Sequence, residues 1–446
     1  MSKSKSKVNQ VGLGRVNLNA AGIDLGARTH YVALPPDREV LVRQFGCFTE
    51  DLNALAEWLK ANAITTVAME STGVYWVPVF QVLERHGLEV QLVSTRHLKA
   101  VPGRKTDVLD CQWIQHLHEC GLLRGSFRPA DAICVVRAYV RHRDTLTEES
   151  ARHVLRMQKA LEQMNVQVHK VVSDITGDTG MAIIDAILKG ERDGKKLASL
   201  RNYRCRKSED EIARALVGDF RDELLFCLQQ ELEAYRFVQA QMVRCEEEIL
   251  VRLKAFEAKA EAMDIPKAKN KEIETSEVRL ALFRAAGVDL SLVPGLGAKN
   301  LETLIAEVGF NLDKFPNEKA FASWSTLAPK NFITGGKRKR TPQSAASRVG
   351  QIFRVAAQTL ANSKTALGAF YRRMRTRKGG TFAVAVTAHK LAKLFYRLLK
   401  NGQNYVESGV DYYEERYKAQ RVRAALKTLA THGFQATLQP IPNAVP

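Results

Sequence analysis

The chain has 446 residues, of which 45% are hydrophobic and 26% are charged, and this composition excludes a disordered chain. The net charge of +19 favours nucleic acid as a partner. No apolar run approaches the roughly 18 residues that cross a membrane, and the start MSKSKSKVNQ lacks the apolar segment of a secretory signal. The seven cysteines form no CxxC pair, so neither a zinc site nor a disulfide framework is indicated. We expect a cytoplasmic protein with no membrane partner.

The first quarter of the chain alternates short β-type runs with helical patterns. Strands are expected over residues 22–26, 29–36, 38–47, 64–70 and 88–94, and helices over 49–62 and 75–87. Three opening strands followed by alternating helix and strand are typical of an α/β layer with a mixed sheet.

The middle of the chain lacks proline and is rich in Arg, Glu, Leu and Gln, which predicts long helices over 137–165 and 226–256. They could form an antiparallel hairpin or an oligomerising coiled coil, with a shorter helical insert at 173–200. The region after about residue 278 is mainly helical. The expected divisions are a basic tail (1–17), the α/β domain (18–130), the helical region (131–257), a charged linker (258–280), a C-terminal domain (281–402) and a tail (403–446).

Four acidic residues stand out in this basic chain. Asp24 lies in the apolar strand GIDLG, and Glu70 ends the strand TTVAME. Asp107 and Asp110 are three residues apart, so on a helix they share one face. Each has an ordinary explanation alone, such as a strand end that meets solvent or an acidic first turn of a helix. Together they suit a two-metal site that holds Mg²⁺.

The order of these motifs resembles a known family. The aspartate of GIDLG, the glutamate of ESTGVYW and the aspartates of KTDVLD are similar to the RuvC-like, RNase H-type domain of DEDD insertion-sequence transposases, the IS110 family. The segments LVPGLGAKNLETLIAEVG, FASWSTLAP and NFITGGKRKRTPQSAASRVGQIFRVAAQTL resemble its second domain and are closest to its IS1111 branch. The resemblance covers roughly residues 20–125 and 285–400.

The resemblance implies an RNA-guided DNA recombinase that excises and inserts a mobile element. It implies a structured noncoding guide RNA (a bridge RNA), donor and target DNA as partners, and a tetramer whose two kinds of domain form composite sites. It implies Mg²⁺ bound by the acidic quartet, and a hydroxyl of the C-terminal domain that forms a covalent link to DNA. The location implied is the bacterial cytoplasm, at the nucleoid during the reaction.

One position departs from the family pattern. The family nucleophile is a serine just before the glycine of the segment that matches NFITGG, and this chain has Thr334 there. Threonine also carries a hydroxyl, although its β-methyl group restricts the side chain. Thr334 is therefore the first candidate for the nucleophile, and Ser344 and Ser347 are the alternatives, each of which could instead cap a helix or lie on the surface.

Two further segments are candidates for binding nucleic acid. The turn PGLG before a helix resembles a helix-hairpin-helix turn, whose backbone N–H groups could hold a phosphate, although an ordinary tight turn fits it as well. GGKRKR reads as a flexible basic loop beside Thr334. The candidate nucleic-acid-binding residues are Lys105, Gly295, Gly297, Lys299, Gly335, Gly336, Lys337, Arg338, Lys339 and Arg340.

Three other functions compete with the recombinase. A RuvC-like two-metal endonuclease or junction resolvase that uses water would leave the last 160 or so residues unexplained. A sugar kinase or actin-like ATPase rests on GIDLG alone and needs a second phosphate loop, which is not found. A non-catalytic scaffold would be favoured if the acidic quartet were broken, and it is intact. The sequence therefore favours the recombinase.

Overall fold

The computed structural model describes residues 14–71, 73–94, 107–261, 265, 276–328, 331–335, 337–340, 347–435 and 437. For 331–334, 337–340, 403–414, 416 and 417 it describes the backbone only. The chain divides into two compact units, Met1–Arg128 and Pro129–Pro446, and each is treated by itself. The finer division into tail, linker and domains stays a prediction.

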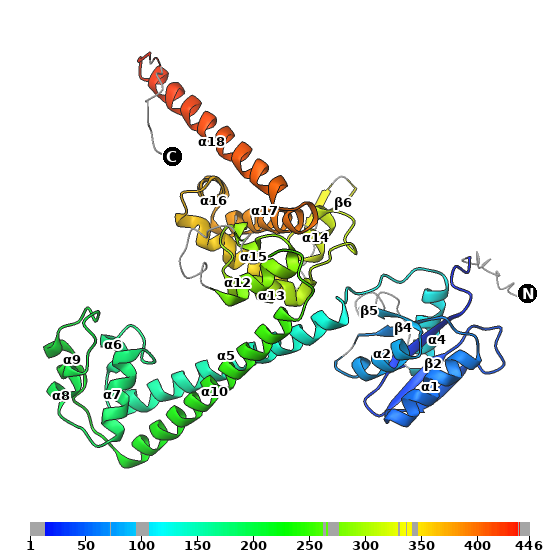
Figure 1. The fold of residues 1–446 in the computed structure, drawn as a ribbon, viewed down its shortest axis with the longest axis horizontal. Coiled ribbons are helices and arrows are strands. Elements are labelled where there is room, and N and C mark those ends of the chain that lie inside the picture. Colours follow the sequence, from blue (N-terminus) through cyan, green and yellow to red (C-terminus); the bar gives the residue numbers. More distant parts are fainter. Residues whose placement is uncertain are drawn as a thin grey trace, which may run out of the picture. The chain divides into compact units, whose positions relative to one another are not determined.

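The first unit is built on a five-stranded mixed sheet (Figure 1). Its strands are β1 (Ala20–Leu25), β2 (Thr29–Ala33), β3 (Val42–Gly46), β4 (Thr66–Glu70) and β5 (Glu89–Val93). They lie in the order β3-β2-β1-β4-β5, with β1, β2 and β3 antiparallel and β1, β4 and β5 parallel. This confirms the predicted mixed sheet and is consistent with an RNase H-like domain.

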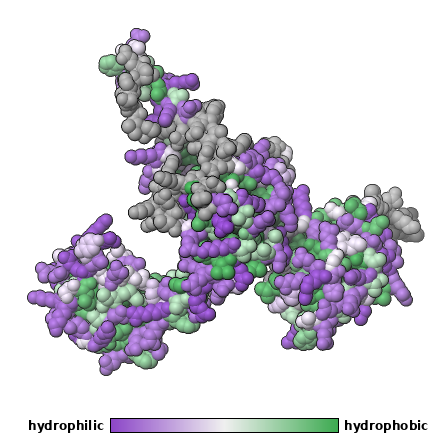
Figure 2. Space-filling model, in the orientation of Figure 1, coloured by the Kyte–Doolittle hydropathy of each residue, from purple (hydrophilic) through white to green (hydrophobic). Residues whose placement is uncertain are grey.

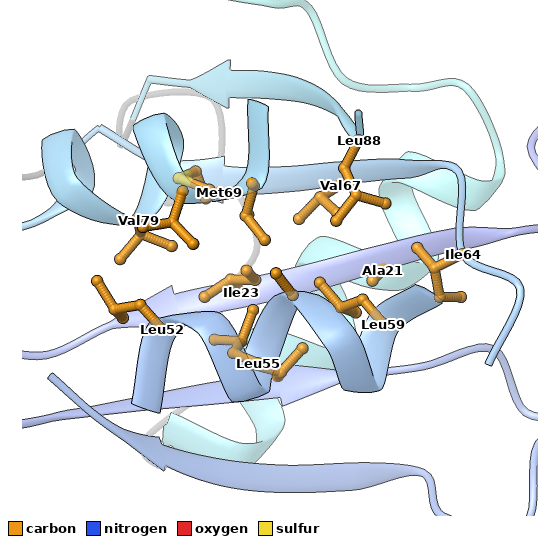
Figure 3. Packing of buried hydrophobic residues seen from close by; sticks show 14 of the residues in the cluster. Ala21, Ile23, Leu52, Leu55, Leu59, Ile64, Val67, Met69, Val79 and Leu88 are labelled. Atoms are coloured by element: carbon orange, nitrogen blue, oxygen red, sulfur yellow. The ribbon is translucent and has the colours of Figure 1, made fainter. Parts of the chain in front are cut away.

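Helices cover both faces of this sheet. The helices α1 (Thr49–Ala61) and α2 (Trp76–Arg85) pack on one face, where Ile23 and Met69 of the sheet meet Leu55 of α1 and Val79 of α2 (Figure 3). The helix α4 (Asp107–Glu119) packs on the other face. The helices predicted over 49–62 and 75–87 are confirmed as α1 and α2. The strands β2 and β3 are shorter than expected, because the prolines after Ala33 open a turn and β3 begins only at Val42.

The second unit begins with two long helices, α5 (Asp131–Gln163) and α10 (Asp222–Lys254), which run antiparallel side by side (Figure 1). The amide of Gln239 lies 2.8 Å from the hydroxyl of Ser150, and the thiol of Cys245 lies 3.2 Å from the carbonyl of Tyr139. The predicted hairpin within one chain is thus confirmed, and coiled-coil oligomerisation stays a prediction.

A small helical lobe forms where α5 ends and α10 begins. It contains α6 (Val168–Val171), α7 (Asp178–Leu188), α8 (Gly194–Ser199) and α9 (Glu209–Ala215). Its apolar core includes Ile183 and Ile212 and joins Met157 of α5 and Leu232 of α10. The predicted helical insert is therefore part of a lobe with a core of its own.

The rest of the second unit is mainly helical, as predicted. Its elements are α12 (Glu277–Ala286), η2 (Leu290–Leu292), α13 (Ala298–Val308), α14 (Glu318–Trp324), β6 (Asn331–Thr334), β7 (Lys337–Arg340), α15 (Arg348–Thr359), η3 (Leu360–Asn362), α16 (Ala366–Lys378), α17 (Gly380–Asn401) and α18 (Gln403–Thr431). Phe321, Phe353 and Phe395 form its aromatic centre, with ring centroids 5.8–6.4 Å apart. Hydrophilic side chains cover most of the visible surface (Figure 2), and no helix among the described residues is long and apolar enough to span a bilayer.

Buried ion pairs join α5 to α13. Arg143 of α5 is 1% exposed and pairs with Glu302 of α13, which is 3% exposed. Five residues further along α13, Glu307 accepts two hydrogen bonds from Arg141, at 2.9 and 3.0 Å. Burial raises the pKa of Glu302, although the charge of Arg143 acts in the opposite direction. Removing one partner would leave a buried charge alone, so these pairs fix how the hairpin meets α13.

Candidate active site

The close contact between α4 and β1 rests on a glycine. A Cβ atom at Gly22 would overlap the backbone of Cys111 and Gln115 on α4, so a larger residue there would push the helix off the sheet. Because side chains alternate along a strand, Asp24 lies on the same face as Gly22, two residues nearer the carboxyl end of β1. Asp24 therefore lies beside the first turn of α4.

Glu70 lies on the same face of the neighbouring strand. The parallel β1–β4 ladder pairs Gly22 with Ala68 and ends with Ile23 opposite Met69, so the next residue of each strand, Asp24 and Glu70, comes beside the other at the carboxyl ends. On β4, Thr66 contacts His118 of α4, with its hydroxyl 2.9 Å from Nε2 of that ring. The helix therefore runs antiparallel to β4, because its last turn lies by Thr66.

The beginning of α4 completes the group. Asp107 and Asp110 occupy its first turn, where the helix dipole favours negative charge. Since the last turn of α4 lies at the amino end of β4, its first turn reaches the carboxyl end, where Asp24 and Glu70 lie. The four acidic side chains chosen from the sequence are thus brought to one edge of the sheet.

The electrostatics of Asp24 show this proximity directly. Its pKa is raised from 3.8 to about 6, first by burial and then by the negative charges of Asp107, Asp110 and Glu70. The thiol of Cys111 has its pKa raised to about 12, by burial and then by Asp24. The charge of Asp24 is thus repelled by the other three carboxylates, and a cation would relieve the repulsion.

The donor set fits a hard divalent cation. Four carboxylates supply only oxygen ligands, which Mg²⁺ prefers, and no thiol or imidazole takes part. However, no three Asp, Glu, His or Cys side chains in the described part of the chain already form a ready metal site. Cation binding would therefore draw the carboxylates together. Residues 95–106, just before α4, lie outside the described residues.

Thr334 lies in a two-stranded hairpin of the second unit. Its strand β6 pairs antiparallel with β7, and Thr334 is opposite Lys337. Gly335 at the turn has φ of +56°, a conformation that glycine adopts without strain. The expected flexible loop GGKRKR is therefore wrong in part, because residues 337–340 form a strand and a Gly-Gly pair favours a tight hairpin. Lys105, Gly336 and Ser344 lie outside the described residues, and of Lys337, Arg338, Lys339 and Arg340 only the backbone is described.

Ser347 is the N-cap of α15 and links the start of this helix to Ser325 and Thr326. Its hydroxyl donates to the carbonyl of Ser325 at 2.7 Å and accepts from the N–H of Gly350 at 3.0 Å, as the N-cap of α15. Its own N–H donates to the hydroxyl of Thr326 at 3.0 Å. The hydroxyl proton of Ser347 is already engaged, which favours a structural role over that of nucleophile.

The PGLG turn is tightly packed. Gly295 has φ of +81°, and a Cβ there would lie 2.6 Å from the carbonyl oxygen of Ala356. Gly297 is the N-cap of α13 and carries no side chain to cap it, so its first N–H groups remain available to an anion. Lys299 pairs with Glu246 of α10 at 3.2 Å. Gly295 thus serves packing, whereas a Cβ at Gly297 would meet nothing within 4 Å, and the phosphate contacts predicted for both glycines stay a prediction.

A long basic stretch contains the clustered cations of residues 337–340 and 372–378. Residues 319–406 contain 18 Lys and Arg and no Asp or Glu. Within the stretch, Arg375, Arg377 and Lys378 are exposed at the end of α16, and none of the three pairs with a carboxylate of the described residues. Such unbalanced charge is visible in the sequence and is typical of a nucleic-acid-binding surface.

The fold and the site define an α/β enzyme domain with an acidic centre, joined to a mainly helical unit rich in cations. The model of the DEDD transposases of the IS110 type matches residues 21–166, and the model of the transposase IS116/IS110/IS902 family matches residues 289–372. No curated protein matches the chain. The chain belongs to the IS110 family of DEDD transposases and is a DNA transposase.

Proposed function

We propose that this transposase is an RNA-guided recombinase that cleaves and rejoins donor and target DNA through a hydroxyl nucleophile and a magnesium-binding DEDD site. The observation that carries the proposal is the convergence of Asp24, Glu70, Asp107 and Asp110, with the pKa of Asp24 raised to about 6. Repelling carboxylates at one sheet edge are poor for stability and suited to divalent cations.

The roles of the side chains follow from their chemistry. The four carboxylates would hold Mg²⁺, which when bound stabilises charge on the attacking and leaving oxygens. Thr334 would supply the hydroxyl that attacks the phosphodiester and forms a covalent link to DNA, and Gly335 beside it lets the hairpin turn tightly. The exposed cations of α16 would hold the DNA backbone.

The guide RNA and the tetramer are part of the proposal. The net charge of +19 supports binding of more than one nucleic-acid strand, and base pairing with RNA would make base-specific protein contacts unnecessary. Sedimentation of the protein with and without its element RNA tests both points. A monomer that sediments unchanged with the RNA would contradict them.

The decisive experiment is a denaturing gel of purified protein with Mg²⁺, its element RNA and end-labelled donor DNA. Wild type is compared with Thr334→Ala and Asp24→Asn, and Thr145→Ala on the exposed face of α5 is the matched control. We expect a covalent protein–DNA band in wild type and control, none in Thr334→Ala, and no cleavage in Asp24→Asn. Cleavage without any covalent species, equal in wild type and Thr334→Ala, would instead favour the water-using endonuclease.

A further inference from the structure

A tyrosine lies directly across from Asp24 on the face that carries the acidic site. In the antiparallel β1–β2 ladder, Asp24 pairs with Tyr31, and in the β2–β3 ladder Tyr31 pairs with Gln44. Paired residues in a sheet share a face, and the Cβ atoms of a direct antiparallel pair lie about 4.5–5.5 Å apart. Glu70, Asp24, Tyr31 and Gln44 thus form one polar row across four strands.

The helix α4 leaves this row open to solvent. It covers the row one step back, where Gly22 pairs with Ala33, which is fully buried. Tyr31, in contrast, is only partly buried and Gln44 is exposed. With strands about 4.8 Å apart the row is about 14 Å long, which is the length of several base pairs of duplex at 3.4 Å each.

The phenol of Tyr31 lacks a partner within the described residues: no hydrogen bond links it to any of them. A buried tyrosine usually finds a hydrogen-bond partner for its hydroxyl, but the hydroxyl of Tyr31 is not among the buried polar atoms that lack one, so it is accessible from solvent. Phenylalanine would fill the same space at this position without an unused polar group. The hydroxyl is therefore available to a ligand that reaches Asp24.

We propose that Tyr31 contacts the substrate: its phenol donates a hydrogen bond to a phosphate oxygen of the DNA strand held at the acidic site, on the side of Asp24 away from Glu70. This inference rests on the proposed function. The carboxylates themselves can only accept hydrogen bonds when ionised, so they cannot bind a phosphate oxygen without a cation. Tyr31 adds a neutral donor beside them and orients the strand without competing for the metal.

The test compares wild type, Tyr31→Phe and Tyr203→Phe in single-turnover cleavage of saturating labelled DNA with Mg²⁺ and element RNA. Tyr203 is 82% exposed in the helical lobe and serves as the matched control. We expect Tyr31→Phe to slow cleavage by about 10- to 100-fold, the value of a hydrogen bond to a charged group. The control should cleave at the wild-type rate, and all three proteins should share one melting temperature.

Binding and the identity of the nucleophile separate the outcomes. DNA affinity measured in Ca²⁺ should change less than the rate does, because the other contacts remain. Cleavage by Tyr31→Phe at the wild-type rate would overturn the proposal. A covalent band lost in Tyr31→Phe but kept in Thr334→Ala would also overturn it, since Tyr31 would then be the nucleophile. If wild type does not cleave, or Asp24→Asn cleaves equally well, the proposed function fails and this contact fails with it.

Discussion

The charge of Asp24 should cost the folded protein stability when no cation is bound. Its pKa is about 6 in the folded state and 3.8 in a model peptide, so the unfolded chain loses its proton first as pH rises. The destabilisation is therefore small below pH 4, grows between pH 4 and 6, and is fully developed at pH 7. A difference of about two units corresponds to about 3 kcal/mol, and partial exposure reduces this to about 1.5–3 kcal/mol.

The perturbation is Asp24→Asn, which keeps the shape of the side chain and removes its charge. At pH 7 without divalent cations, the transition of the first unit in differential scanning calorimetry should rise by about 5–10 °C for a unit of this size. At pH 4 the gain should nearly disappear. Glu57→Gln, at an exposed position of α1, is the control and should leave the transition unchanged.

Mg²⁺ should reverse the order of the transition temperatures of wild type and Asp24→Asn. The cation binds the folded wild type and so raises its transition temperature, whereas the Asp24→Asn variant should gain much less. An Asp24→Asn variant that melts at or below the wild-type temperature at pH 7 without Mg²⁺ would refute the reasoning. So would a gain of equal size at pH 4 and pH 7, because the carboxylate of Asp24 would then not be the cause.

Three further results are expected. His118 is buried with its pKa lowered from 6.5 to about 4, so the unfolded chain takes the proton first as pH falls. Between pH 7 and 5 the wild type should therefore lose about 2 kcal/mol of stability in urea relative to His118→Gln, because the contribution of Asp24 is common to both proteins. Ser347→Ala should lower stability by about 1 kcal/mol in urea and retain the covalent DNA band, whereas loss of that band in a folded variant would make Ser347 the nucleophile. Changing Arg375, Arg377 and Lys378 together to Gln should reduce the slope of log affinity for DNA against log salt by about 2–3. The control is the same change at three exposed lysines of the helical lobe, which should leave the slope unchanged. If both triple variants keep the wild-type slope, DNA binds elsewhere on the protein.

Local sequence patterns predicted which helices and strands form better than they predicted the residues at which these elements begin and end. The period-two strands and the apolar spacing of 49–62 and 75–87 are confirmed because each pattern matches a face that is buried in the fold. The end of β2 and the strand β7 were missed, since turn geometry decides them. GGKRKR looked like a loop because its cations dominate its composition, yet residues 337–340 pair with β6 as a strand.

The candidate site needed the sheet register to be recognised as a whole. The sequence indicated Asp24, Glu70, Asp107 and Asp110 separately, but only the β1–β4 pairing and the direction of α4 bring them to one edge. Tyr31 carries no motif at all, because its relation to Asp24 is set by the β1–β2 turn and by which residues pair across it. Which hydroxyl attacks DNA stays a prediction.

The contact at Gly22 has an evolutionary consequence. The spacing between Asp24 and the start of α4 is set by one backbone resting on another, and no change of side-chain rotamer can adjust it. Drift elsewhere in the core, where one apolar residue can replace another, would leave this spacing intact. A mutation could therefore change the distance between the carboxylates by exchanging aspartate for glutamate, or by moving the backbone of α4 itself, as a larger residue at Gly22 would do.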